Sequence, residues 1–273
     1  MGWYDKLFDA ESYTLANGKT VSQKFTRVPL LVLLLLIAIG ISVWVTGFKL
    51  TTLFTNSSGF WNIFGSMFPP KLSYFMQVWQ PLLMTIQMSF FGSFFGALLA
   101  LPFAVLAAHN ITNNKIVNLL IRFILTVVRT IPTLVSALIA TYIFGLGTFA
   151  GTVAIFLFSF SFVGKQLFEY IETVDMGAYE ALTATGANAP RAFVTTIFPQ
   201  ILPIYLSTAL FAFEGNVRYA AILGYVGAGG IGMILNEKIG WREFNSVGMI
   251  LLSIFVAVVI IETVSQRLRK HLS

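Results

Sequence analysis

Long apolar runs recur along this 273-residue sequence and predict helices that cross a lipid bilayer. A helix rises ~1.5 Å per residue, so about 20 apolar residues are needed to cross the ~30 Å hydrocarbon core. Pro29 to Phe48 meets that length without a single charged residue. Further, mostly apolar runs extend from about Trp79 to Ala108, from about Ile201 to Val226 and from about Ser246 to Thr263. Pro102 predicts a kink in the run from Trp79 to Ala108.

The stretch from Thr130 to Gly164 has no Asp, Glu, Lys, Arg or His and is too long for one straight crossing. Gly145-Leu146-Gly147 lies near its middle and predicts a break in the helix. We therefore expect two further spans joined by a very short hairpin, the first of them beginning before Arg129. The total is about six spans, and five remain possible if one half of this stretch is not a full crossing.

Polar stretches divide the chain. Lys165 to Pro190 holds four acids, which predicts a solvated helical segment between spans. The loop after the first span is rich in Asn, Ser, Gly and aromatic residues, as expected of a water-facing loop with an interfacial aromatic segment. A Gly-rich loop to Gly232 leads into a polar loop at 233–245. The expected organisation is an N-terminal segment (1–28), a first span (29–48), a loop (49–78), a core (79–268) containing the segment 165–200, and a tail (269–273).

The first 28 residues carry both charge signs. Trp3, Tyr4, Leu7 and Phe8 recur there at helical spacing, as in a short helix lying on a membrane surface. A disordered tail with a few aromatic residues is the alternative.

Composition supports the membrane assignment independently of any motif. Apolar residues make up 57% of the chain and charged residues 10%, whereas a soluble domain carries about 25% charged residues. The fold class we expect is therefore all-α and polytopic. The net charge of +6 does not indicate a nucleic-acid partner, because the basic residues flank apolar runs beside an anionic bilayer surface. There is no cysteine, and His109 and His271 are far apart, so no metal site is expected.

The distribution of basic residues gives an orientation. Six spans place both termini on one side of the membrane. If that side is the cytoplasm, only Lys49, Lys71, Lys238 and Arg242 fall outside, Arg218 falls within a span, and the other twelve of the 17 Lys and Arg residues fall inside. This agrees with the positive-inside rule, so both termini are expected in the cytoplasm.

The segment from Glu180 to Pro199 reads as helix, break, helix on the cytoplasmic side. Gly186 can end the first helix at positive φ, Asn188 can cap the next one, and Pro190 suits its first turn. From these residues alone, a helical hairpin that docks a soluble partner and an ordinary inter-helix loop are equally good interpretations.

The spacing resembles the cytoplasmic EAA loop of ABC importer permeases. Glu180, Ala181, Gly186 and Pro199 fall in register with it, whereas Leu182, Phe198 and Ile197 depart conservatively from it. The resemblance implies a type I permease fold in a bacterial cell membrane. It also implies that this loop is a coupling helix on an ATPase subunit, with Glu180 and Gly186 at the interface.

Further blocks resemble phosphonate-type permeases. These are Arg129-Thr130-Ile131-Pro132, Phe213 to Arg218, and Ile222 to Gly232, although methionine-type permeases have a similar Gly-rich loop. The resemblance covers roughly 75–268. It implies an ABC ATPase dimer, an extracytoplasmic substrate-binding protein and a second permease subunit as partners. ATP and Mg²⁺ would bind the ATPase. This chain has no P-loop motif and no cluster of catalytic residues, so it is not expected to be an enzyme.

Glu214 and Arg218 are charged residues within a span, four positions apart and able to pair. Because a lone charge costs ~2.5–3.5 kcal/mol or more at bilayer depth, such residues usually face a bundle interior or a water-filled cavity. One interpretation is a structural ion pair. In the other, Arg218, with Asn216 nearby, lines the pathway of an anionic solute.

The stretch from Gly227 to Gly232 matches the G-x-G-x-x-G pattern of dinucleotide sites. That interpretation fails because the pattern needs a preceding strand, and here a membrane span precedes it. Gly227, Gly229, Gly230 and Gly232 are instead expected to allow close backbone approach, or to let a broken helix line the pathway. A gradient-driven secondary transporter that uses Glu214 and Arg218 as a charge relay, and a membrane scaffold without transport, are the alternative functions.

Overall fold

The computed structural model describes residues 12–16, 18–22, 28–49, 51, 55 and 57–272. It divides into two units, 1–62 and 63–273. Trp3, Tyr4, Leu7 and Phe8, for which a surface helix was one interpretation, lie outside the described residues.

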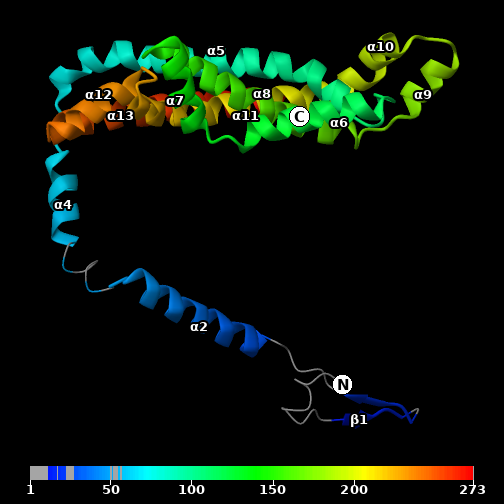
Figure 1. The fold of residues 1–273 in the computed structure, drawn as a ribbon, viewed down its shortest axis with the longest axis horizontal. Helices are drawn as coiled ribbons and strands as arrows, with labels where there is room; N and C mark the ends of the chain where they lie inside the picture. Colours follow the sequence, from blue (N-terminus) through cyan, green and yellow to red (C-terminus); the bar gives the residue numbers. More distant parts are fainter. Residues whose placement is uncertain are drawn as a thin grey trace. The chain divides into compact units, whose positions relative to one another are not determined.

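The first unit contains a β-hairpin and a long apolar helix (Figure 1). Strands β1 (Ser12–Thr14) and β2 (Thr20–Ser22) pair antiparallel in a segment where no strand was predicted. Helix α2 (Val28–Thr46) coincides with the first predicted span, is long and apolar enough to cross a membrane, and has no buried residue. Helix α4 (Ser57–Ser66) crosses the division between the units. It forms within the predicted loop 49–78, so that prediction missed a helix.

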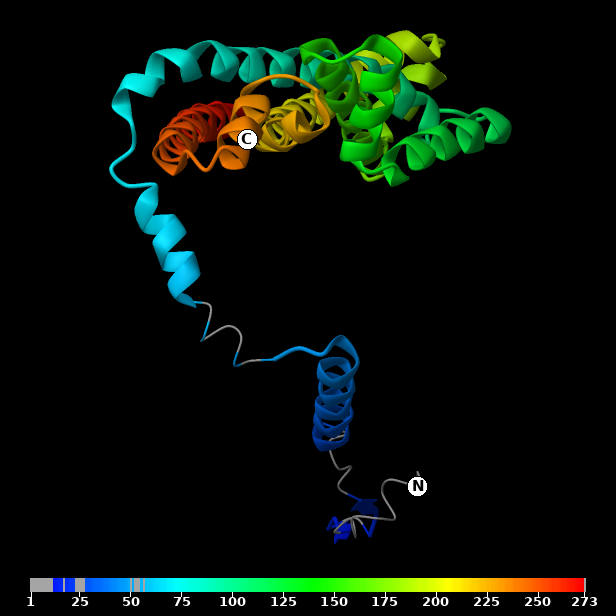
Figure 2. The same cartoon turned by 60° about the vertical axis from the view of Figure 1, so that its left-hand side comes forward.

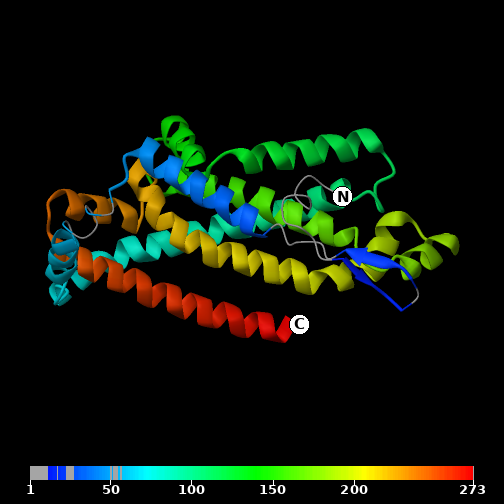
Figure 3. The ribbon, with the colours of Figure 1, turned by 90° about the horizontal axis from the view of Figure 1, so that it is seen from below.

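The second unit is a bundle of long helices joined by short turns (Figures 1 and 2). A 3₁₀ turn, η1 (Leu72–Tyr74), precedes its first long helix, and a second 3₁₀ turn, η3 (Gly224–Val226), follows α11. In Figure 3, α11 and α13 run side by side. In chain order the helices are α5 (Phe75–Ala107), α6 (Lys115–Thr130), α7 (Thr133–Phe144), α8 (Thr148–Ile171), α9 (Gly177–Ala184), α10 (Ala189–Ala192), the π-helical turn η2 (Phe193–Ile197), α11 (Phe198–Leu223), α12 (Ile231–Gly240) and α13 (Phe244–Leu272).

Small residues let α5 and α8 pack closely. Gly92 and Gly96 lie four positions apart on one face of α5. A Cβ at Gly92 would lie 2.7 Å from Cγ2 of Ile155, and one at Gly96 would lie 2.7 Å from the carbonyl oxygen of Phe156. Helices in lipid associate through such close contacts, because apolar burial alone offers little gain there.

Five helical stretches are long and apolar enough to cross a membrane, and the bent pair α6–α7 gives up to six. The predicted break at Gly145 to Gly147 is confirmed, since α7 ends before it and α8 begins after it. The prediction missed a second break. The chain bends by 90° between α6 and α7 at Ile131 and Pro132, because a residue before proline is forced out of helical geometry.

Two other boundaries differ from the predicted ones. Helix α8 continues to Ile171, so the first residues of the predicted solvated segment are its last turns, with Leu167 and Ile171 buried. The predicted loop 233–245 is largely helix α12. Ile231 is buried there and Ile234 and Leu235 pack beside it, which is the spacing of one helical face.

Candidate functional site

The predicted helix, break and helix between Glu180 and Pro199 are all present. Helix α9 ends before Gly186, whose φ of +91° is the left-handed conformation that glycine adopts without strain. The Asn188 side chain accepts a hydrogen bond from the backbone N–H of Arg191 at 3.3 Å, and Pro190 lies in the first turn of α10. The predicted helix end at Gly186, the cap at Asn188 and the first-turn position of Pro190 are therefore confirmed.

This segment presents a free outer face. Glu180, Ala181, Gly186 and Pro199 are all exposed, and α9 has no buried residue. Its inner side is held to the bundle, because Met176 and Tyr179 pack on a core cluster that includes Phe193 and Ile197. A rigidly backed, exposed helix of this kind can dock against another protein. That role for these residues stays a prediction.

The start of the segment is tied to the α5–α6 turn. Glu172, which follows α8, accepts a hydrogen bond from the backbone N–H of His109 at 2.8 Å and forms an ion pair with Arg122. The Nε–H of Arg122 donates to the carbonyl oxygen of Ala107 at 2.8 Å. The guanidinium also lies 4.5 Å from the ring centre of Phe168. These contacts fix the end of α8, from which the chain leads into α9, to α5 and α6.

Four charged side chains on α11 and α13 form a continuous chain of ion pairs. Glu214, with a side chain only 7% exposed, contacts Arg218 at 2.5 Å and Arg269 at 3.1 Å. Arg218 also lies 3.4 Å from Glu262. The predicted pairing of Glu214 with Arg218 is confirmed, and the two positive charges on Glu214 offset the cost of burying it.

Glu262 and Arg269 were missed from sequence. The available signal was their spacing of seven residues, which places them on one face of a single helix. Arg218 remains 51% exposed, so a pathway role and a structural role are both compatible with this geometry.

Asn216 occupies a different environment from Arg218. It is fully buried between α5 and α8, and its Nδ2 donates to Oγ of Ser93 at 2.8 Å and to Oγ of Ser159 at 2.7 Å. Two positions along a helix point to different faces, which separates Asn216 from the ion-pair chain. Within this unit Asn216 joins three helices by hydrogen bonds rather than lining an open surface.

The glycine-rich loop is a site of close backbone contact. A Cβ at Gly229 would lie 2.6 Å from the backbone nitrogen of Thr148, and one at Gly232 would lie 2.0 Å from the carbonyl oxygen of Ala221. The N–H of Gly147 donates to the carbonyl oxygen of Gly227 at 2.9 Å, which joins the loop to the α7–α8 break. Gly230 lies against Thr85, whose hydroxyl oxygen accepts a hydrogen bond from the N–H of Ile231 at 2.7 Å.

The first interpretation of these glycines, close backbone approach, therefore describes this structure. Helix α11 and the turn η3, not a strand, lead directly into the loop; β1 and β2, the only strands among the described residues, lie near the start of the chain. Lining of a pathway by these residues stays a prediction.

An ion pair beside an aromatic ring lies at the other end of the unit from α9 (Figure 1). Lys238 Nζ is 3.1 Å from a carboxylate oxygen of Glu243 and 5.0 Å from the ring centre of Trp241. The hydrogen bond that the Lys238 ammonium donates to the Glu243 carboxylate raises the pKa of Lys238 and lowers the pKa of Glu243. Both groups are therefore charged at neutral pH and fix α12 against the start of α13.

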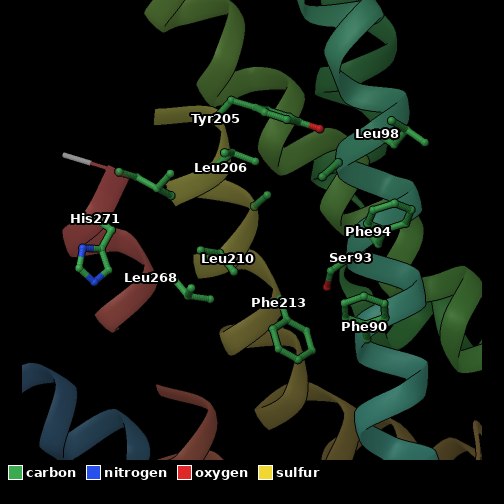
Figure 4. Close-up of a pocket in the computed structure, with 13 residues that line it drawn as sticks. Phe90, Ser93, Phe94, Leu98, Tyr205, Leu206, Leu210, Phe213, Leu268 and His271 are labelled. Atoms are coloured by element: carbon green, nitrogen blue, oxygen red, sulfur yellow. The ribbon is translucent and has the colours of Figure 1, made fainter. Parts of the chain in front are cut away.

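An apolar groove of about 450 Å³ runs between α5, α11 and α13. Figure 4 shows Phe90 and Phe94 on one wall, Leu210 and Phe213 on another, and Leu268 and His271 along the side formed by α13. Its lining is apolar except for a few side chains such as Ser93 and Tyr205, so it offers packing surface rather than chemistry. No group of three or more His, Asp or Glu residues that could hold a metal ion occurs in the described part of the chain.

The relatives found by comparison with known proteins are named as permease proteins of transport systems. A putative cryptic phosphonate transport system permease protein of Escherichia coli is 39% identical over 119 residues, covering 44% of this chain and 98% of that protein. The phosphate-import permease protein of Mycolicibacterium smegmatis is 38% identical over 128 residues, covering 47% of this chain and 24% of that protein. The phosphite transport system permease protein of Stutzerimonas stutzeri is 36% identical over 127 residues, covering 46% of each. The matched stretch thus spans half or less of two of these relatives.

The fold has a counterpart among solved structures. The MetNI methionine ABC transporter in an inward-facing conformation matches with a TM-score of 0.64 and 23% identity, over 74% of this chain and 99% of that one. At that identity the likeness shows the fold of an importer permease. The family described as the inner membrane component of binding-protein-dependent transport systems matches residues 100–273. This chain belongs to that family, and it is a multi-pass membrane protein.

Proposed function

We propose that this chain is the permease subunit of an ATP-driven importer for phosphonate or a related phosphorus oxyanion. The observation that carries the proposal is the exposed, rigidly backed helix α9 followed by Gly186, in a chain of this transport family. The relatives are named as permeases of phosphonate, phosphate and phosphite transport, which supports a phosphorus oxyanion as the solute. The methionine transporter shares the fold at 23% identity, too low to favour its substrate.

The proposed assembly has four kinds of component. Two permease subunits, either identical or closely related, enclose the pathway, and an ABC ATPase dimer binds ATP and Mg²⁺. A substrate-binding protein delivers the solute on the outer side, where α12 lies. Both chain termini and α9 face the cytoplasm, in line with the distribution of basic residues. Closure of the ATPase dimer would move α9, and the links through Glu172 and Arg122 would carry that motion into the bundle.

Uptake into proteoliposomes tests this function. The assembled complex, with ATP enclosed and binding protein and radiolabelled methylphosphonate outside, is expected to accumulate solute only when ATP is present. Collapsing proton and sodium gradients with ionophores should leave the rate unchanged. Uptake that needs a gradient and ignores ATP would replace the proposal with the secondary transporter. Accumulation of methionine but of no phosphorus oxyanion would move the substrate to the methionine class.

The same assay separates the two interpretations of Arg218. We expect Arg218→Gln to reduce uptake about tenfold or more, the scale of one lost charge-assisted contact, without loss of assembly or basal ATP hydrolysis. Thr263→Val is a suitable control, because the Thr263 hydroxyl is already bonded to the carbonyl oxygen of Val259 at 2.7 Å. If Arg218→Gln yields no assembled complex, the ion pair is structural.

A further inference from the structure

A small polar pocket lies between α8, α11 and α13, beside the chain of ion pairs. Its volume is about 260 Å³, and its lining residues are Phe162, Gln166, Ser207, Thr208, Phe211 and Arg269. A water molecule takes up about 30 Å³ of liquid, so the pocket has room for a tetrahedral oxyanion with water around it. This is a more polar lining than that of the groove in Figure 4.

The hydroxyl and amide groups that line this pocket are not engaged in hydrogen bonds that stabilise the fold. Within the described residues, Gln166, Ser207 and Thr208 form no side-chain hydrogen bond. Other hydroxyls on these helices bond to their own backbone: Thr152 to the carbonyl oxygen of Thr148 at 2.8 Å, and Ser253 to that of Met249 at 2.8 Å. Polar groups within a membrane are normally satisfied in this way. Three groups that line one pocket and are not so satisfied leave donors available to a bound molecule.

Positive charge flanks the same pocket. The guanidinium carbon of Arg269 lies 5.9 Å from the ring centre of Phe211, and that of Arg129 lies 5.9 Å from the ring centre of Phe162. The two rings stack at 6.4 Å and form one wall. Arg269 itself lines the pocket, and the guanidinium of Arg129 lies over the ring of the lining residue Phe162. Two guanidinium groups at its walls favour an anion as the ligand.

We propose that this pocket binds a phosphorus oxyanion, with Arg269 supplying charge and Gln166, Ser207 and Thr208 supplying hydrogen bonds. The proposal rests on the proposed function and adds to it an inner binding site on the permease itself. A phosphate or phosphonate group has several acceptor oxygens, which suits one guanidinium and three neutral donors. The group could belong to the solute or to the headgroup of a phospholipid.

The test measures binding of inorganic phosphate to the purified full chain in maltoside detergent, by isothermal titration. The wild-type chain is expected to bind phosphate saturably. The Ser207→Ala/Thr208→Val double variant is expected to bind phosphate at least about tenfold more weakly, because hydrogen bonds to a charged ligand are lost. Gln166→Leu, a change at an exposed side chain, should weaken binding in the same direction, and Thr263→Val should bind as the wild type does.

The source of the oxyanion is resolved by repeating the titration in nanodiscs that contain phosphatidylglycerol. If the site takes a soluble oxyanion, the affinity for phosphate and its dependence on Ser207 and Thr208 persist. If a lipid headgroup occupies it, phosphate binding disappears there. Native mass spectrometry then retains a phosphatidylglycerol on the wild-type chain but not on the double variant. The proposal that this pocket binds an oxyanion is overturned if the wild type and the double variant bind phosphate equally, or if the wild type shows no saturable binding. ATP-independent uptake, with binding intact, would instead count against the importer alone.

Discussion

Replacing Gly232 with alanine is expected to disrupt the packing of α12 on α11 and to destabilise the chain by about 3 kcal/mol. The added Cβ would lie 2.0 Å from the carbonyl oxygen of Ala221 and 2.8 Å from Cα of Gly224. Both neighbours are backbone atoms, so no side chain can rotate away, and one helix must move. The measurement is the thermal transition of the purified chain in detergent, together with the monodisperse fraction recovered by size exclusion.

Gly215→Ala is the matched control. Gly215 lies within α11, and a Cβ there meets nothing within 4 Å. Alanine favours a helix by roughly 1 kcal/mol over glycine, so this variant should be as stable as the wild type or more so. If Gly232→Ala has the same thermal transition temperature as the wild type, α12 does not pack on α11 as described.

Reversing the charge of Glu180 is expected to weaken docking of the ATPase at least about thirtyfold while leaving the permease folded. The side chain is exposed on α9, which has no buried residue, so Glu180→Lys removes no internal packing. A central interface residue contributes about 2 kcal/mol or more, which corresponds to that factor. Binding of the purified ATPase to nanodisc-embedded chain, measured by interferometry, gives the ratio.

Glu237→Lys makes the same change of charge on α12, at the opposite end of the unit (Figure 1). It should leave ATPase affinity unchanged, because its pairing with Lys238 at 4.0 Å is a weak surface contact. Equal loss of affinity in both variants would indicate a general effect of charge rather than an interface at α9.

Sequence reasoning was most successful where one local rule determines the backbone. The spans, the break at Gly145 to Gly147 and the positive φ of Gly186 all follow from length, apolarity and glycine chemistry. The bend at Pro132 obeys an equally local rule that was not applied to this span. The hairpin of β1 and β2 also had a signal, because Asn17-Gly18 is a strong turn dipeptide between short alternating runs.

The candidate site could be predicted only in part, because helical spacing gives a face but not the neighbour that covers it. Glu214 and Arg218 were correctly paired since both are on α11. Their partners Glu262 and Arg269 are 44 to 55 residues away, and only the packing of α13 on α11 brings them together. For the same reason Asn216, near Arg218 in sequence, lies instead among Ser93 and Ser159.

The most direct test of the central claim is a mild-detergent pull-down of this chain from its native membrane, followed by mass spectrometry. The account predicts that a P-loop ATPase and an extracytoplasmic binding protein co-purify, and that the Glu180→Lys variant loses the ATPase but keeps its own fold. A wild-type chain that is isolated without any ATPase in several detergents would contradict the assignment of α9 as the coupling helix.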